Sequence, residues 1–384
     1  MPDRVLITGA RAPAALAVAR SFAAAGFEAH LADSSPAFMA RASFAVAGVH
    51  RHASPRSAPE AFASDIQRLV GTLQPRLVVP TCEEVFHLAL AGGGCGMADR
   101  LFAPSSDALR RLHSKHAFGH ACAALSLPAP PTVRVTDPEA LRRAAADPAR
   151  IVVKREFSRF GVQALVSPGA ADLSRIRPRQ DEAWVVQERI AGEEVSFYAV
   201  CVGGRLTAFS AYRSTWRLAG GAGYAFRSLD GAIMEQLRAH AAVLAREIVG
   251  TGQFACDAIL DADGKAWLIE CNPRSTSGVF LFGRSEDLAQ AMLGRAMTTD
   301  LVPACDVRPA MWSYGLAEAL RTGRLSEWAR HIREGSDVVG VPGDRLPAAG
   351  ALVDTVVFAR RALGAGQSLN AAMTADIEWN GDAS

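Results

Sequence analysis

A hairpin near residue 260 carries three polar side chains that suit a hard metal ion. Asp263-Gly264 lies between two apolar runs, which is a strong signal for a β-hairpin. With these two residues in the turn, Asp257 lies directly opposite Glu270, and Asn272 shares their face because side chains alternate along a strand. If the turn is two residues longer, the two carboxylates lie one diagonal step apart and still share that face.

Two carboxylates on facing strands repel each other, because opposed Cβ atoms lie only about 5 Å apart. A bound cation offsets that repulsion, and Mg²⁺ commonly takes one or two carboxylates together with substrate phosphates. We therefore predict a site for Mg²⁺ or Mn²⁺ at Asp257, Glu270 and Asn272. The alternative is a solvated edge on which both acids face water. The other face is expected to pack into the core through Cys256, Ala258, Leu260, Trp267, Ile269 and Cys271.

Lysine is rare in this chain. Only Lys115, Lys154 and Lys265 occur among the 41 basic residues, and all the others are arginine. Lysine is a compact point charge on a flexible stem, so a chain that otherwise uses arginine keeps it where a point charge is needed. The alternative is that codon bias left these three by chance.

The sequence ECNPR at 270–274, following Asp257, resembles the metal-binding pattern of the ATP-grasp superfamily, which includes D-alanine–D-alanine ligase, biotin carboxylase and carbamoyl phosphate synthetase. The resemblance covers roughly residues 1–300. It implies that Asp257, Glu270 and Asn272 hold magnesium ions that bridge the ATP phosphates. It also implies that Arg274 lies beside the transferring phosphoryl group.

The resemblance extends to the two lysines and to a loop between them and the hairpin. By resemblance Lys115 and Lys154 reach the ATP phosphates, and Lys154 joins Arg274 as a catalytic residue. The segment REFSRFG at 155–161 resembles the loop that closes over the triphosphate, although such loops are usually richer in glycine. Arg155 or Arg159 would then compensate; the alternative is an ordinary hairpin loop.

The segment VVQERIAGEEVSF at 185–197 resembles the hinge of the same superfamily. By resemblance Gln187, Glu188 and Ile190 meet the adenine, and Glu194 binds the ribose hydroxyls. A vicinal diol is well served by a carboxylate, which accepts both hydrogen bonds.

The resemblance implies an ATP-dependent ligase that activates a carboxylate as an acyl phosphate and couples it to an amine, releasing ADP and phosphate. Its partners are then small carboxylate and amine substrates, and relatives often form homodimers. Candidates for the substrate pocket are less specific, and each has a surface or loop role as its alternative: Arg213, Arg217, Arg227, Ser275, Thr276, Ser277 and Gly278.

The pattern of strands and helices predicts an α/β protein, with an ATP-grasp fold preceded by a Rossmann-like parallel sheet. Four units are expected. They are an N-terminal α/β unit at 1–104, a lid with its linker helix at 105–190, a core with the metal site at 191–304, and a mostly helical extension at 305–384.

Two rival functions remain open on the sequence. Gly9 follows a strand, and Asp33 lies about 20 residues on, as in an NAD(P)-binding epimerase or reductase. Ala12 and Ala15 replace the other glycines of that fingerprint, and the paired catalytic tyrosine and lysine are absent. The second rival is an ATP-binding regulator that does not turn over.

The bulk composition excludes several partners. A net charge of +2 with 21% charged residues gives no reason to expect nucleic acid or an anionic membrane. No long apolar run or signal peptide is visible, so no membrane segment is expected. Seven cysteines without a CxxC pair fit a reducing cytoplasm.

Overall fold

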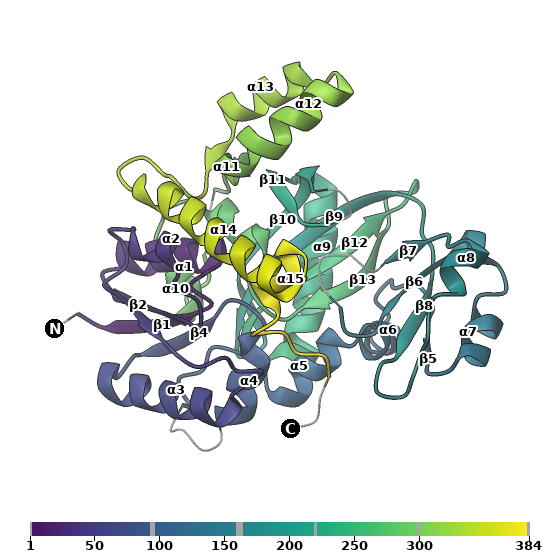
Figure 1. Ribbon diagram of the computed structural model, residues 1–384, viewed down its shortest axis with the longest axis horizontal. Coiled ribbons are helices and arrows are strands. Elements are labelled where there is room, and N and C mark those ends of the chain that lie inside the picture. Colours follow the sequence, from purple (N-terminus) through teal and green to yellow (C-terminus); the bar gives the residue numbers. More distant parts are fainter. Residues whose placement is uncertain (1, 93–96, 159–163, 219–220, 298–299, 382–384) are drawn as a thin grey trace.

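The N-terminal part forms the predicted parallel sheet. The computed structural model describes residues 2–92, 97–158, 164–218, 221–297 and 300–381. The strands β1 (Arg4–Thr8), β2 (Glu28–Asp33), β3 (Gly48–Arg51) and β4 (Leu77–Pro80) pair in the order β3-β2-β1-β4. Side chains alternate, so Val5 and Ile7 pack with α1 (Pro13–Ala24), whereas Leu6 and Val78 pack with α3 (Pro59–Leu73) on the other face. The short helices α2 (Phe38–Arg41) and α4 (Glu84–Ala91) complete this unit (Figure 1).

The lid is a small antiparallel sheet approached by two capped helices. Ser105 caps α5 (Ser106–His113), and Ser114 caps α6 (Lys115–Ala124), each by accepting a backbone N–H. The sheet follows in the order β5-β8-β6-β7. Its strands are β5 (Thr132–Val135), β6 (Ile151–Arg155), β7 (Leu165–Val166) and β8 (Trp184–Glu188), with α7 (Pro138–Ala144), η2 (Pro148–Arg150) and α8 (Ala170–Leu173) between them.

A seven-stranded sheet forms the core, in the order β13-β12-β9-β10-β11-β14-β15. One face packs Phe197, Phe254 and Cys256 against α9 (Gly231–Leu244), which continues as the π-helical turn η3 (Ala245–Val249). The opposite face packs Tyr198 and Ala255 against η4 (Ser277–Phe282) and α10 (Asp287–Met292). The strands are β9 (Glu193–Val202), β10 (Arg205–Arg217), β11 (Gly223–Ser228), β12 (Gly252–Leu260), β13 (Ala266–Asn272), β14 (Ala304–Asp306) and β15 (Ser336–Asp337).

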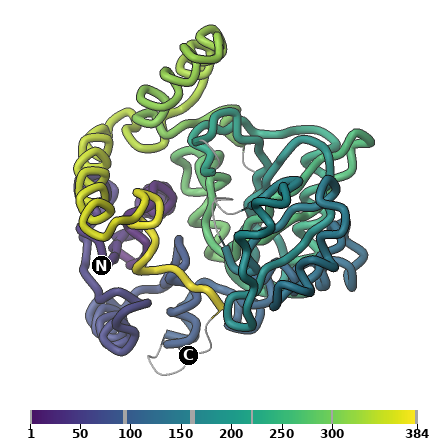
Figure 2. Tube along the Cα trace, turned by 45° about the vertical axis from the view of Figure 1, so that its right-hand side comes forward, coloured from purple at the N-terminus to yellow at the C-terminus, as the bar shows by residue number. Residues whose placement is uncertain are grey.

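The C-terminal part is mostly helical, as expected, but it also gives strand β15 to the core sheet, and β14 spans the predicted boundary at 304–305. Between these strands, α11 (Arg308–Ala310), η5 (Met311–Gly315), α12 (Leu316–Thr322) and α13 (Leu325–Glu334) project as a helical hairpin (Figure 1). Helix α14 (Leu346–Ala365) then returns to the N-terminal unit, where Asp354 accepts the backbone N–H groups of Phe38 and Met39. Helix α15 (Leu369–Thr374) follows, and in both views the chain then crosses toward the linker helices (Figure 2).

Among the described residues, no helix is both long and apolar enough to cross a membrane.

Candidate active site

The hairpin β12–β13 places the predicted acids face to face. Asp257 pairs with Glu270 across the two strands, and Ala255 pairs with Asn272. The turn is longer than two residues, because Leu260 pairs with Ala266 and the Asp261 side chain accepts the backbone N–H groups of Asp263 and Lys265. A β-bulge beside Asp257 absorbs the difference in register.

The bulge corrects the predicted core face. Because Ile269 is the extra residue, the core positions on β13 are Ala266, Leu268 and Cys271, and Trp267 instead donates its indole N–H to Asp261 at 2.7 Å. The bulge also frees the Ile269 carbonyl, which accepts hydrogen bonds from Lys154 Nζ at 3.3 Å and from Gln187 Nε2 at 3.4 Å. A bulge in the strand that carries Glu270 thereby joins the lid to the core.

Asp257 is held in a crowded, largely desolvated position. Ser196 on the neighbouring strand donates its hydroxyl to Asp257 at 2.6 Å, and Asn272 Nδ2 lies 3.4 Å from the other carboxylate oxygen. Burial and the facing Glu270 raise the pKa of Asp257 to about 7, although Ser196 acts to lower it. The charge on Asp257 is therefore destabilised by its burial and by Glu270 opposite it.

Glu270 lies between the two lysines. Its Oε2 is 3.6 Å from Lys115 Nζ and 3.7 Å from Lys154 Nζ. Burial acts to raise the pKa of Glu270, but the two ammonium groups outweigh it and hold the pKa below its usual value. Burial lowers the pKa of Lys154 to about 8, with Glu270 opposing that shift.

This donor set fits a magnesium ion bound together with phosphate. The described residues contain no group of three His, Cys, Asp or Glu side chains that could hold a metal by themselves. Asp257, Glu270 and Asn272 supply two carboxylates and an amide oxygen, and a metal bound there needs further oxygen ligands from a substrate. A bound cation would offset the repulsion between Asp257 and Glu270, which is one cause of the raised pKa of Asp257.

Arg274 lies beside this cluster. Its Nη2 is 3.3 Å from Asn272 Oδ1, and its Nη1 donates to the Ser275 carbonyl at 3.2 Å. The same Nη2 lies 3.9 Å from the carboxylate of Glu83, a buried residue after β4 that the sequence analysis did not single out. The only sequence signal for Glu83 was its position just beyond the carboxyl end of a parallel strand, where open α/β sheets bind ligands.

The predicted hinge residues are dispersed. Gln187 is buried and donates to Thr132 at 2.9 Å, whereas the Glu188 carboxylate lies 3.9 Å from Arg150 and Ile190 is half-buried. Glu194 pairs with Arg217 at 2.7 Å. It lies two residues from Ser196 on β9, so both share the face of Asp257.

The structure thus joins Lys115, Lys154, Asp257, Glu270, Asn272 and Arg274 into one cluster, with Gln187 linked through the Ile269 carbonyl. Lys115 Nζ donates at 3.0 Å to the carbonyl of Ser158, which lies in the loop after β6. Arg155, the last residue of β6, pairs with Glu182. The candidates Arg159 and Gly161 lie outside the described residues.

Gly192 explains how the hinge approaches the metal hairpin so closely. A Cβ at Gly192 would lie 2.1 Å from the backbone carbonyl oxygen of Leu260. Gly192→Ala is expected to displace the hinge, to destabilise the fold by about 1–3 kcal/mol, and to weaken ATP binding. Chemical denaturation and nucleotide titration check this, with Gly71→Ala on α3 as control, because a Cβ at Gly71 would meet nothing within 4 Å outside its own helix. Equal ATP affinity in Gly192→Ala and wild type would contradict the expectation.

The pKa of Asp257 predicts that metal binding at the expected site depends on pH. A metal needs the carboxylate, so below pH 7 binding must release the proton, whereas above pH 7 it need not. Calorimetry of Mn²⁺ binding in buffers of different ionisation enthalpy is expected to show about one proton released per ion well below pH 7 and almost none well above it. Ser196→Ala should move this transition to higher pH, because Ser196 holds the pKa of Asp257 down. Proton release that is independent of pH in wild type would refute the assignment of Asp257.

The weaker substrate candidates have other partners. Arg213 pairs with Glu193 at 3.2 Å and Arg227 with Glu334 at 3.1 Å. Ser275 is buried and donates to Gln253 at 2.6 Å. Gln253 in turn donates to the Pro80 carbonyl at 2.6 Å, so this network ties the segment after Arg274 to the N-terminal sheet. Tyr212 contacts Thr276 at 3.4 Å, Ser277 begins η4, and Gly278 accepts from Ser210.

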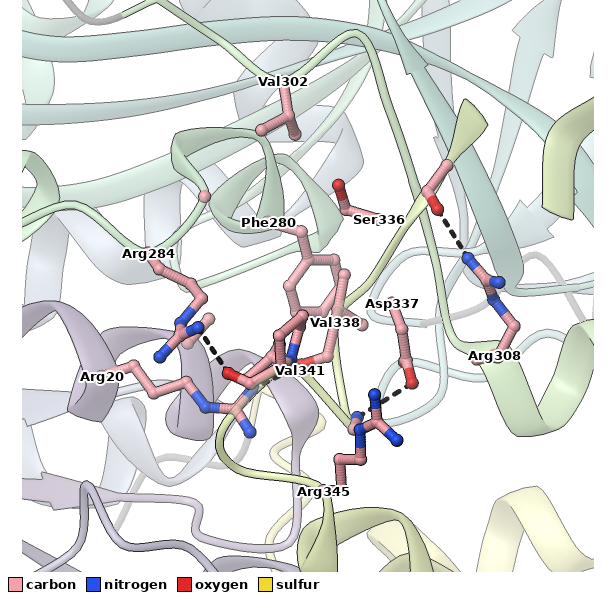
Figure 3. A pocket seen from close by; sticks show the side chains of 15 residues that line it. Arg20, Phe280, Arg284, Val302, Arg308, Ser336, Asp337, Val338, Val341 and Arg345 are labelled. Carbon is pink, nitrogen blue, oxygen red and sulfur yellow. Dashed lines mark hydrogen bonds between the residues drawn. The ribbon is translucent and has the colours of Figure 1, made fainter. Parts of the chain in front are cut away.

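A cavity of about 580 Å³ lies elsewhere, between α1, the residues after η4 and residues 335–345 (Figure 3). Its lining includes Phe280 and Val338 and several arginines. Arg20 is engaged with Asp344 and with backbone carbonyls, and Arg308 is engaged with Asp306. None of the predicted site residues lines this cavity, so it is separate from the cluster around Glu270.

The structure also accounts for Asp33, the acid of the rival dinucleotide fingerprint. Asp33 is buried and accepts hydrogen bonds from the backbone and side chain of Arg11, the closest at 2.6 Å. Arg11 therefore takes the hydrogen bonds that a ribose diol would need. This arrangement gives no support to an NAD(P) site.

No protein-family model matches this sequence, and no curated protein matches it significantly. Solved structures do. The biotin carboxylase domain dimer of the 2-oxoglutarate carboxylase from Hydrogenobacter thermophilus, in complex with MgADP, ADP and bicarbonate, has a TM-score of 0.62 at 14% identity over 78% of this chain and 72% of that one. N5-carboxyaminoimidazole synthetase from Staphylococcus aureus gives 0.58 at 12% identity over 78% and 79%. L-amino acid ligase from Bacillus licheniformis gives 0.53 at 14% identity over 72% and 68%. All three are ATP-grasp proteins, and the likeness shows that this chain has the ATP-grasp fold.

Proposed function

From the ATP-grasp fold and the cluster around Glu270, we propose that this protein is an ATP- and Mg²⁺-dependent ligase that joins a carboxylate to an amine. The observation that carries the proposal is the position of Glu270, with Asp257 opposite it and both Lys115 and Lys154 within 4 Å. A structural ion pair needs only one lysine, whereas both lysines here approach the same carboxylate oxygen of Glu270. Two lysines, a second carboxylate and Arg274 in one place fit a site for a polyanion and its metal.

The neighbours support nucleotide and magnesium as the cofactors. The biotin carboxylase domain was crystallised with MgADP, and the Staphylococcus aureus synthetase was crystallised with ADP. We infer that Asp257, Glu270 and Asn272 would hold the metal, that Lys115 and Lys154 bind the phosphates, and that Gln187, Glu188, Ile190 and Glu194 surround the nucleoside. Bound Mg²⁺ would supply positive charge at the phosphate oxygens.

The protein's own residues then position and neutralise the reacting groups. A substrate carboxylate oxygen attacks the γ-phosphorus in line, the bond from that phosphorus to the β–γ bridging oxygen breaks, and ADP leaves. Lys154 and Arg274 stabilise the charge that spreads over the transferring phosphoryl group. The amine nitrogen then attacks the acyl carbon, the bond to the phosphate oxygen breaks, and the amine loses a proton. The lid sheet excludes water from the acyl phosphate.

The L-amino acid ligase among the structural neighbours is our reason for proposing an amine as the nucleophile. Neither step of the reaction needs a covalent enzyme intermediate. The described residues around Glu270 include no serine–histidine or cysteine–histidine pair that would act as one. The rival of a non-catalytic ATP-binding regulator gains nothing from the structure, since Asp257, Glu270, Asn272 and Arg274 all converge.

We further expect a homodimer in the cytoplasm. The biotin carboxylase domain is a dimer, and every cysteine in the described segments is free. Analytical ultracentrifugation tests the assembly.

The test of the function is ADP and phosphate release from Mg-ATP over a matrix of carboxylates and amines, with mass spectrometry on each active mixture. Substrate-dependent ADP release with a product whose mass equals carboxylate plus amine minus water supports the proposal. If ATP neither turns over nor raises the melting temperature of the wild-type protein, the proposal is wrong.

A further inference from the structure

The segment after α15, residues 375–381, runs from the N-terminal unit to the loop of the lid. Figure 1 shows it leaving α15 and crossing toward α5. Its contacts involve parts of the chain that are far apart in sequence. We refer to residues 375–381 as the strap.

One end of the strap is anchored on the N-terminal sheet. The Asp376 carboxylate binds Arg11 at 2.6 and 2.9 Å and accepts the Ser34 hydroxyl at 2.6 Å. Arg11 is itself buried against Asp33, so Arg11, Asp33 and the partly exposed Asp376 form one ion cluster. Burial acts to raise the pKa of Asp376, but Arg11 and Ser34 outweigh it and keep the pKa low. Asp376 is therefore ionised near neutral pH, and its ion pair with Arg11 holds this end of the strap in place.

The other end inserts an indole between the N-terminal unit and the lid with its linker helix. Trp379 is only 6% exposed and stacks on Phe86 of α4 with ring centroids 4.6 Å apart and planes 11° apart. Its ring also meets Phe157 of the lid loop edge-on at 5.4 Å and lies 6.1 Å from His113 of α5. Arg110 covers the ring at 5.7 Å. An aromatic residue with this much contact is an anchor, since burial of such a ring is among the largest single contributions to packing.

Two neighbours of Trp379, Glu83 and Phe157, connect it to the proposed phosphate site. The Trp379 backbone N–H donates to Glu83 Oε2 at 3.2 Å, and Glu83 Oε1 lies 3.9 Å from Arg274 Nη2. Phe157 precedes Ser158, whose carbonyl accepts from Lys115 Nζ at 3.0 Å. Trp379 thus touches the residue that holds Arg274 and the loop that holds Lys115.

We propose that Trp379 is a positioning residue, through which the strap sets the loop after β6 and the Glu83–Arg274 pair for phosphate binding. Its effect on kinetics rests on the ligase function proposed above. The strap itself contributes no group to the reaction. Its part is to fix Lys115 and Arg274 relative to each other, although they lie on different units.

The test compares Trp379→Ala and Trp379→Phe with Trp312→Ala, a matched control at a tryptophan that is 53% exposed on the projecting helical hairpin. Hydrogen–deuterium exchange of peptides covering residues 113–118 and 154–158 reports the loop without any turnover. Mg-ATP titration and, where substrates are known, separate kcat and KM for ATP report its consequence.

Trp379→Ala is expected to speed exchange in both peptides and to weaken ATP binding by about tenfold or more, because misplacement of reacting groups by about 1 Å costs up to about 10²-fold. Trp379→Phe should restore most of the affinity, and Trp312→Ala should resemble wild type. Unchanged exchange in Trp379→Ala would show that Trp379 does not hold the loop, and it would overturn the proposal. Faster exchange with wild-type ATP binding overturns the positioning role. A wild-type protein that binds no ATP refutes the proposed ligase instead, while the exchange result still decides whether Trp379 holds the loop.

Discussion

Replacing Glu270 by glutamine is expected to lower kcat/KM by about 10²–10³, the usual loss when one preorganised charged group is removed from a phosphoryl-transfer site. The change is isosteric, so the hairpin keeps its register opposite Asp257. The variant loses a metal ligand and leaves the ammonium groups of Lys115 and Lys154 without their shared carboxylate. Initial rates of ADP release at several Mg²⁺ concentrations measure the loss.

The same variant also tests the cause of the raised pKa of Asp257. Glu270 raises the pKa of Asp257, so that pKa should fall when Glu270 becomes neutral. Glu193→Gln is the matched control, because Glu193 is an exposed glutamate on β9 that pairs with Arg213 outside the cluster. Glu270→Gln with turnover close to wild type would remove the basis for the metal site.

Arg274→Lys is expected to lower kcat by about 10²–10³ while KM for ATP changes little, since an interaction made mainly in the transition state affects kcat. Lysine keeps the charge but lacks the fork with which Arg274 reaches Asn272 and the Ser275 carbonyl and faces Glu83. Steady-state kinetics with saturating carboxylate and amine measure the effect.

Arg284→Lys is the control for this substitution. Arg284 is exposed at the cavity of Figure 3, where it donates to the Pro342 carbonyl, and it has no contact with the cluster around Glu270. A loss in Arg274→Lys that appears only as a higher KM for ATP would instead make Arg274 a binding residue.

The hairpin shows what could and could not be predicted from sequence. Alternation along a strand sufficed to place Asp257 opposite Glu270, since any turn of suitable length keeps them on one face. The bulge at Ile269 was not predictable, because no glycine or other local signal marks it and the pairing of both strands decides it. The missed bulge is why Trp267 and Ile269 were wrongly assigned to the core.

Residues whose contacts lie in other units could also not be predicted from the sequence. Lys115 and Lys154 stood out by their rarity, and the resemblance supplied their roles. Glu83, Ser196 and Trp379 carried no such signal, because their neighbours come from segments far apart in the chain. The strands β14 and β15 could not be predicted because they are only three and two residues long.

The ion cluster of Arg11 with Asp376 joins residues 365 positions apart. On the ribosome Arg11 and Asp33 emerge early, and Arg11 lacks its second carboxylate until Asp376 has been synthesised. Long-range closure of this kind is slow to form. The loop of the lid therefore lacks its contact with Trp379 until residue 379 has left the exit tunnel, so the proposed phosphate site is ordered later than the strands that carry it.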